Sequence, residues 1–110
     1  MKRPKYNNKK TVLDGIKFDS LSESKRYTQL KWMEKAGEIK GLELQPPYPI
    51  VIDGFKVCTY KADFKYRDAA TDDLVVEDVK SVYTAKLPIY RLKKKLVWAV
   101  YKIDVKEVMM

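Results

Sequence analysis

Two strand-like runs joined by a short polar turn occupy residues 55–80. The first run covers residues 55–66 and the second covers residues 74–80. Apolar and β-branched residues dominate both runs, whereas the connecting segment RDAATDD is typical of a turn. The pattern predicts an antiparallel strand pair whose turn is centred between Ala70 and Thr71.

Turn and capping signals place a ribbon and a helix before this pair. Asp14-Gly15 lies between β-branched and apolar residues and predicts a small β-ribbon. Ser20 begins a capping box with Glu23, so a helix is predicted to start there and to stop at Gly37. The apolar stripe of this helix consists of Tyr27, Leu30 and Met33.

Further strands and a second helix complete the pattern. Residues 39–45 and 49–52 are strand-like segments interrupted by prolines, and Asp53-Gly54 predicts a second hairpin turn. Pro88 suits the first turn of a second helix, and residues 102–108 form a last strand. The face of this helix that is predicted to pack in the core consists of Ile89, Leu92, Leu96, Ala99 and Val100.

The fold class that follows is α/β (α+β), with one domain over residues 11–110 behind a flexible basic arm, residues 1–10. A chain of 110 residues has room for one core. The expected order is ribbon, helix, three strands, helix and strand, arranged around a mixed sheet.

The charge balance favours an anionic partner, of which nucleic acid is the commonest. Lys and Arg number 23 against 15 Asp and Glu, which gives a formal net charge of +8, and there is no histidine. An imidazole general base and a histidine-rich zinc site are therefore excluded. The single cysteine, Cys58, is expected to be a small buried hydrophobe in a cytoplasmic protein with no membrane-spanning segment.

Two acids interrupt the predicted strand pair. With the turn centred as above, Asp63 stands directly opposite Asp78, and like charges about 5 Å apart are destabilising without a counter-charge. A divalent cation bound by both carboxylates resolves this repulsion. Because side chains alternate along a strand, Asp78 and Lys80 share one face and Glu77 points to the other. The alternative is an ordinary hairpin in which Asp63 pairs diagonally with Lys80 and Asp78 is solvated.

Glu23 offers a third carboxylate to this site. It lies in line with Tyr27 and Leu30 on the inward face of the first helix. The competing interpretation is local, because Glu23 also completes the capping box with Ser20.

The set resembles the PD-(D/E)XK nuclease superfamily, whose core is helix, three strands, helix and strand. The resemblance covers residues 20–108 and is strongest to small phage-encoded nuclease-like proteins. Ala62 replaces the proline of the motif name, and Asp78 stands where glutamate is more usual. The matching pieces are DGIKFDS, Glu23, Tyr27, Leu30, GEI, LELQP, Asp63 and VVEDVK.

The resemblance implies a metal-dependent DNA endonuclease. Mg²⁺ or Mn²⁺ would be bound by Glu23, Asp63, Asp78 and the Val79 carbonyl, and Lys80 would assist the attacking water. Gln45 corresponds to a polar residue that related nucleases place close to the site. A structure-specific role in phage replication or recombination is implied, such as that of a Holliday-junction resolvase, by a homodimer in the cytoplasm of a bacterial host.

Basic residues outside this site are expected to contact DNA phosphates. A solvated basic face is the alternative for the second helix, and Trp98 either stacks on a base or lies in a dimer interface. Two other functions remain open: a basic DNA-binding module that has the nuclease fold without cleavage, and a small α+β interaction domain. The expected DNA-contacting residues are Lys9, Lys10, Arg91, Lys94, Lys95 and Trp98.

Overall fold

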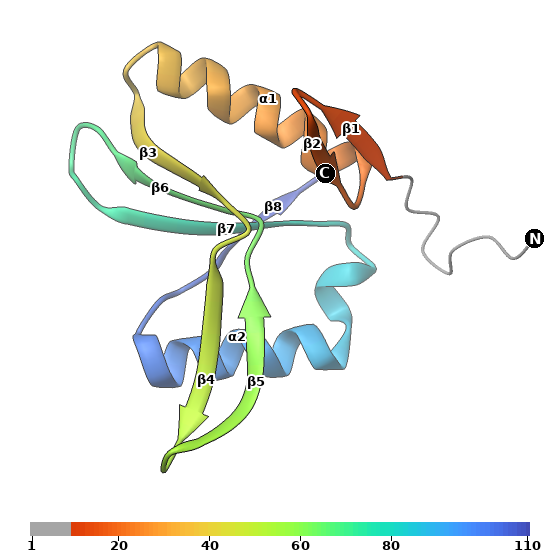
Figure 1. Cartoon of the computed structure of the whole chain (residues 1–110), viewed down its shortest axis with the longest axis vertical. Helices are drawn as coiled ribbons and strands as arrows, with labels where there is room; N and C mark the ends of the chain where they lie inside the picture. Colours follow the sequence, from red (N-terminus) through yellow and green to blue (C-terminus); the bar gives the residue numbers. More distant parts are fainter. Residues whose placement is uncertain (1–9) are drawn as a thin grey trace, which may run out of the picture.

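Two helices lie on opposite faces of a four-stranded sheet (Figure 1). The computed structural model describes residues 10–110. The elements are β1 (Thr11–Leu13), β2 (Ile16–Phe18), α1 (Leu21–Lys35), β3 (Ile39–Leu44), β4 (Pro47–Ile52), β5 (Phe55–Lys61), β6 (Phe64–Asp68), β7 (Leu74–Lys80), the 3₁₀ turn η1 (Thr84–Lys86), α2 (Pro88–Tyr101) and β8 (Lys106–Met109). The predicted α+β class is confirmed.

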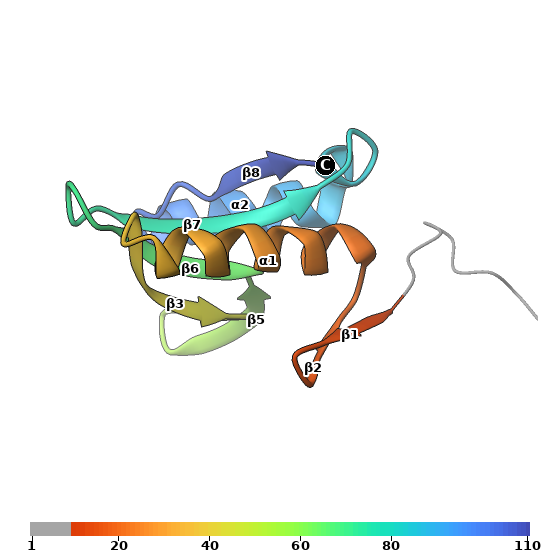
Figure 2. The ribbon, with the colours of Figure 1, turned by 90° about the horizontal axis from the view of Figure 1, so that it is seen from above.

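The central sheet has the strand order β3-β6-β7-β8 and is mixed, as predicted. Strands β6 and β7 are antiparallel, with Phe64 opposite Glu77 and Arg67 opposite Leu74, which is the register predicted from the turn. Strand β8 follows α2 and pairs with β7 in parallel. Figure 2 shows β7 passing between the two helices. The carboxyl end of β7 is therefore surrounded by elements on both sides.

The long strand predicted over residues 55–66 is wrong, because the chain bends at Ala62-Asp63. Strand β5 pairs only with β4, and this hairpin leaves the central sheet and extends past α2 (Figure 1). The neighbouring strand bends at the same level, where Gln45 adopts a φ of 52° between β3 and β4. Gln45 N–H donates to the Asp63 carbonyl at 2.9 Å, so the two bends remain hydrogen-bonded to each other.

The bend divides one apolar series between two cores. Tyr60 and Ala62 pack in the core beside α2, whereas Phe64 and Tyr66 pack in the core beside α1. In a continuous strand all four side chains would have faced the same core. Cys58 is half-buried at the edge of the α2 core and forms no disulfide, so it is less buried than predicted.

Helix α1 follows its prediction. The Ser20 hydroxyl accepts from the Glu23 N–H at 3.1 Å, and Gly37 adopts a φ of 80° after the last turn. Tyr27 and Leu30 are buried, and Met33 packs against the same core. The capping signals at both ends located the helix, and the stripe identified its buried face.

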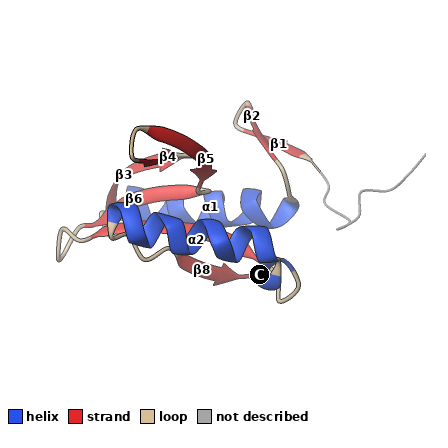
Figure 3. Ribbon diagram, turned by 90° about the horizontal axis from the view of Figure 1, so that it is seen from below, coloured by secondary structure: helices blue, strands red, loops and turns tan. Residues whose placement is uncertain are grey.

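Helix α2 begins at Pro88 as predicted, but the face predicted to be buried is wrong. Tyr90 and Val97 are the buried residues, packed against Val76 and Val105 of the α2 core. Ile89 is 68% exposed and Leu92 is 56% exposed. In Figure 3, α2 lies in front of the sheet and α1 lies behind it. The helix is rotated so that its aromatic Tyr90, whose hydroxyl bonds Glu107 at 2.7 Å, enters the core instead of the aliphatic stripe.

The last strand is shorter than predicted. Lys102 ends α2 with a φ of 58°, and residues 102–105 connect the helix to β8 without strand pairing. Val105 is nevertheless buried at the start of β8, so the apolar alternation at this point reflects burial and not strand structure.

Candidate functional site

Asp63 and Asp78 meet where the β6–β7 ladder ends. The Asp63 N–H donates to Asp78 Oδ1 at 2.8 Å, and the Val79 N–H donates to Asp63 Oδ2 at 2.8 Å. Each carboxylate is thus held by the backbone of the other's strand. The structure brings the two acids together one step beyond the last ladder pair, Phe64 with Glu77, as the register predicted.

Glu23 joins them from the first turn of α1. Its Oε2 accepts from the Asp19 N–H at 3.2 Å, so Glu23 makes its local contact one residue before Ser20, the residue that the capping box predicted. The same carboxyl also interacts electrostatically with the Asp63 carboxyl. Burial and the adjacent Asp63 charge raise the pKa of Glu23 to about 8. The two interpretations of Glu23 are therefore compatible, because one side chain has both the local contact and the interaction with Asp63.

Asp78 is buried, and its second oxygen faces the α2 side of the sheet. There Asp78 Oδ2 accepts from the Tyr60 hydroxyl, a partner that the sequence did not indicate. Burial raises the pKa of Asp78 to about 6, although Lys80 and the Asp63 N–H oppose the rise. Burial also raises the pKa of Asp63, against the hydrogen bond from Val79. All three acids are therefore easier to protonate than ordinary carboxyl groups.

Lys80 lies between two small pockets that open beside these acids. One pocket, of about 350 Å³, is lined by Lys80 together with Asp78 and Tyr90. The other, of about 130 Å³, is lined by Lys80 together with Glu23 and Val79. The Lys80 Nζ lies 4.3 Å from the centre of the Tyr90 ring, so the ammonium is held on the α2 face of the sheet. Lys80 is consequently the one residue of the predicted set that borders both pockets.

Glu77 lies on the opposite face of β7, and its role is structural. The guanidinium of Arg26 donates to both of its carboxylate oxygens, with Nε to Oε1 at 2.6 Å and Nη2 to Oε2 at 3.1 Å. The Tyr66 hydroxyl also donates to Glu77 Oε2, at 2.8 Å. Glu77 is 0% exposed, and its charge is fully neutralised inside the α1 core. Strand parity thus separates Glu77 from Asp78, as the sequence predicted.

The described residues contain no ready-made cluster of three or more acidic, cysteine or histidine ligands around a common point. The acids instead form a row in which Glu23 contacts Asp63 and Asp63 contacts Asp78. Every donor in the row is an oxygen, which suits a hard cation such as Mg²⁺ or Mn²⁺ and not a thiolate or imidazole metal. The donor chemistry therefore fits the predicted metal.

Residues 3–109 match a family model described as a protein of unknown function (DUF1064). The chain belongs to the DUF1064 family. No curated protein and no solved structure matches it. Within residues 10–110, no helix is both long enough and apolar enough to cross a membrane.

The basic residues that were predicted on α2 lie together in this DUF1064 protein, in a pocket that contains none of the three acids. Arg91, Lys94, Lys95 and Trp98 line one pocket of about 380 Å³ that also contains Asp104 and Glu107. This pocket shares no lining residue with the two pockets beside Lys80. Lys94 lies 3.8 Å from Glu107, so part of the positive charge is neutralised locally.

Two lysines that the sequence did not single out share a pocket with Asp78. Lys61 and Lys93 line the same pocket as Asp78 and Lys80. Lys61 is the last residue of β5, and Lys93 lies one turn after Tyr90 on α2. Only the bend after β5 brings these two elements together, so no local signal in the sequence could have linked them.

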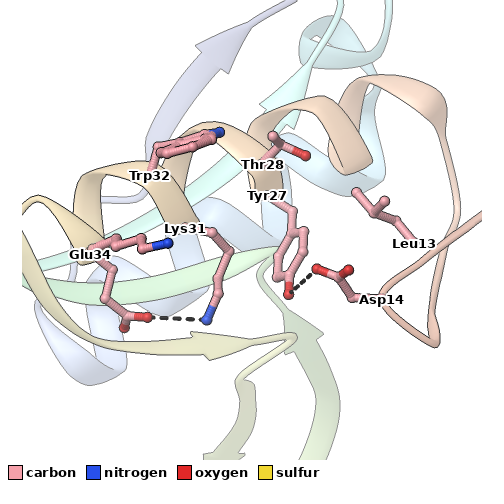
Figure 4. A pocket seen from close by; sticks show the side chains of 8 residues that line it. Leu13, Asp14, Tyr27, Thr28, Lys31, Trp32 and Glu34 are labelled. Atoms are coloured by element: carbon pink, nitrogen blue, oxygen red, sulfur yellow. Dashed lines mark hydrogen bonds and ion pairs between the residues drawn. The ribbon is translucent and has the colours of Figure 1, made fainter.

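The remaining predicted residues contribute less. The Gln45 backbone touches Asp63, but its side chain is exposed and lines none of the pockets described above. Lys10 is exposed at the start of the described chain, and Lys9 lies with the rest of the predicted arm outside the described residues. A larger pocket, of about 560 Å³, lies between the ribbon and α1 and contains none of the predicted site residues (Figure 4). Its walls include Leu13, Tyr27 and Trp32.

The raised pKa of Asp78 predicts how stability depends on pH in the absence of metal. A carboxyl whose pKa rises on folding binds more protons in the native state than in the unfolded state. The ionised form of Asp78 therefore lowers the free energy of unfolding as the pH rises towards and past 6. At pH 8, Asp78→Asn is expected to raise the free energy of unfolding by up to about 2 to 3 kcal/mol, because it removes a buried charge. Below pH 4 the gain should vanish.

Urea denaturation in EDTA at pH 4, 6 and 8 measures this effect. Asp73→Asn is the matched control, since it makes the same charge change at an exposed position five residues earlier. A difference between Asp78→Asn and the wild type that is the same at every pH would contradict the prediction.

Proposed function

We propose that this protein is a divalent-metal-dependent DNA endonuclease of the PD-(D/E)XK type. The observation that carries the proposal is the row of Glu23, Asp63 and Asp78 beside Lys80 at the carboxyl end of β7. Among the described residues, no salt bridge within 4 Å neutralises any of the three acids. Acids that are half-buried or buried beside one another, with hydrogen bonds but no ion pair, are costly to keep charged, and they are typical of sites where a cation or a reaction requires them.

The order of elements supports the same proposal. Helix α1 supplies Glu23, the bend before β6 supplies Asp63, and β7 supplies Asp78 and Lys80. Strands β3, β6 and β7 are followed by α2 and the parallel strand β8, which is compatible with the helix, three strands, helix and strand of that superfamily. The β4–β5 hairpin is then an insertion between the first two strands of the core.

The roles of the residues follow from their chemistry. Glu23, Asp63, Asp78 and the Val79 carbonyl are the candidate ligands of Mg²⁺ or Mn²⁺. When bound, such a cation stabilises negative charge on the phosphate and lowers the pKa of a coordinated water. Lys80 is positioned to hold a phosphate oxygen or to orient the attacking water. Since the chain has no histidine, the proton of that water passes to a carboxylate or to solvent.

Tyr60 and Tyr90 position the side chains of Asp78 and Lys80. The Tyr60 hydroxyl fixes the orientation of Asp78 from β5, and the Tyr90 ring supports the Lys80 ammonium from α2. Neither tyrosine is required to react in the proposed hydrolysis. They are positioning residues, and they tie the site to the α2 side of the sheet.

DNA could bind at either of two basic surfaces, the pocket of Asp78 and Lys80 or the pocket of Arg91 and Lys95. If the scissile phosphate lies in the pocket of Asp78 and Lys80, then Lys61 and Lys93 contact the flanking phosphates. Replacing both by alanine is expected to weaken binding and to reduce the slope of log affinity against log salt by about 1 to 2. Fluorescence anisotropy with labelled DNA in Ca²⁺, at several salt concentrations, measures the slope.

The matched control for that pair is Arg91→Ala with Lys95→Ala, which removes the same charge from the pocket on the other side of α2. If the control variant reduces the salt slope more than the Lys61 and Lys93 variant does, DNA binds at the α2 surface that was predicted from the sequence. Equal slopes in both variants and the wild type would exclude both surfaces.

Cleavage assays test the proposed function directly. Linear, flapped and four-way branched DNA are incubated with the protein in Mg²⁺, in Mn²⁺ and in EDTA. Cleavage that requires the metal is expected, and a preference for the branched substrates would support a structure-specific role. Salt-dependent binding with no cleavage of any substrate would leave a DNA-binding module with this fold. An absence of binding would remove DNA as the partner.

A further inference from the structure

An aliphatic stripe on α2 is left uncovered. Ile89 is 68% exposed, Leu92 is 56% exposed and Val100 is 41% exposed, and Ala99 is exposed beside them. Leu96, in the middle, is half-buried against the α2 core. These five residues are called the α2 stripe below. They are the residues whose periodicity predicted a buried face, so the helix has two apolar faces and the core covers only the one that contains Tyr90 and Val97.

The spacing of the stripe is that of a helix-packing surface. Ile89, Leu92, Leu96 and Ala99 follow one another at intervals of three, four and three residues, which is the pattern that pairs one helix with another. The pattern is also complementary to itself. When two copies of α2 run antiparallel, Ile89 faces Ala99 of the second copy and Leu92 faces Leu96 of the second copy. A large residue then meets a small one at each end, which suits a two-fold interface.

The β4–β5 hairpin enlarges the uncovered surface. Tyr90 and Lys94 face Glu107 of β8, so the stripe lies on the other side of α2, towards which the hairpin tip extends (Figure 1). The tip exposes Val51, Ile52, Val57 and Phe55, the last of them 71% exposed. Together, tip and stripe expose seven large apolar side chains, each of them at least 41% exposed. Large contiguous apolar patches are rare on monomeric proteins and mark interaction sites.

Charge argues against DNA as the occupant of this surface. The stripe contains no basic residue, and Arg91 lies on the opposite side of the helix, in the pocket with Trp98. Lys93 and Lys95 flank the stripe on its two sides, so an antiparallel pair of helices brings like charges together near the two-fold axis. Such a dimer is strengthened by salt, because salt screens that repulsion, whereas binding to DNA is weakened by salt.

We infer that the α2 stripe and the β4–β5 hairpin tip form the interface of a homodimer in which two copies of α2 pack antiparallel. The interface lies outside the two pockets beside Lys80, apart from Ile89 at the rim of one of them. The inference does not depend on the proposed nuclease function.

Analytical ultracentrifugation of the full chain without DNA tests the dimer. At about 100 µM protein, the wild type is expected to dimerise and to dimerise more strongly at about 500 mM than at about 50 mM NaCl. Leu92→Glu is expected to raise the dissociation constant at least about 100-fold, because the carboxylate enters the interface twice. Leu21→Glu is the matched control, since Leu21 is a similarly exposed leucine on α1 and lies outside the surface.

Crosslinking tests the antiparallel arrangement in a Cys58→Ala background. A mixture of chains carrying Ile89→Cys and chains carrying Ala99→Cys is expected to crosslink with a short bismaleimide, and chains carrying Ala99→Cys alone are not. A wild type that stays monomeric at high salt overturns the inference, as do equal dimerisation constants for Leu92→Glu and Leu21→Glu. If Leu92→Glu weakens DNA binding and leaves the association state unchanged, the surface contacts DNA and the inference fails.

Discussion

Asp78→Asn is expected to lower the rate of metal-dependent DNA cleavage by about 100- to 1000-fold. The substitution keeps the shape of the side chain and an acceptor for the Asp63 N–H, but it removes the charge that would hold the cation. Lys80→Ala is expected to lose activity to a similar degree, because Lys80 borders both pockets of the site. DNA affinity should change little for Asp78→Asn, since loss of a negative charge does not weaken phosphate contacts.

Single-turnover cleavage in Mg²⁺ and in Mn²⁺ measures both effects separately from binding. Asp73→Asn and Lys106→Ala are controls that make the same chemical changes at exposed positions. Equal cleavage by the wild type and by both site variants would show that the site is elsewhere, or that another nuclease is present in the sample. Because Asp78→Asn is also expected to be more stable than the wild type at pH 8, its loss of activity cannot be attributed to unfolding.

Arg26→Ala is expected to destabilise the fold by about 3 to 5 kcal/mol, the largest single effect on stability predicted for this protein. It leaves Glu77, which is 0% exposed, without its charge partner inside the α1 core. A domain of this size has a total stability of about 5 to 15 kcal/mol, so the variant is expected to lose a large share of it. Urea denaturation followed by circular dichroism measures the difference.

Lys31→Ala is the control for that prediction. Lys31 also pairs with a glutamate, Glu34, but the lysine side chain of that pair is 49% exposed, and loss of such a pair costs less than about 1 kcal/mol. The double variant Arg26→Met with Glu77→Gln should recover much of the loss, because it removes both charges and keeps an acceptor for the Tyr66 hydroxyl. A cost below about 1 kcal/mol for Arg26→Ala would mean that water reaches Glu77.

The candidate site illustrates which contacts a sequence can predict. Opposition of Asp63 and Asp78 follows from the length of one turn, and the separation of Asp78 from Glu77 follows from strand alternation. Both are short-range geometric consequences of a strand pair. Asp78 also contacts Tyr60 of β5, and Glu77 contacts Arg26 of α1. These contacts join elements outside the strand pair, so no residue spacing in the sequence predicts them.

The fold shows the same division. Helix starts at Ser20 and Pro88, and hairpin turns at Asp14-Gly15 and Asp53-Gly54, depend on the backbone preferences of a few adjacent residues. The sequence alone therefore determined where these elements begin and turn. It also determined that two acids and a lysine lie at the end of one strand pair.

Only the tertiary structure decided how the elements bend and which surfaces they bury. The bend at Ala62-Asp63 was invisible because the apolar alternation continues through it, with one half of the series serving each core. Helix α2 carries two apolar faces, and periodicity cannot say which of them the sheet will cover. Tyr90 and Val97 are buried because they pack with Val76 and Val105 and because the Tyr90 hydroxyl bonds Glu107. The same orientation of α2 leaves the aliphatic stripe uncovered, where we infer that a second copy of the chain binds.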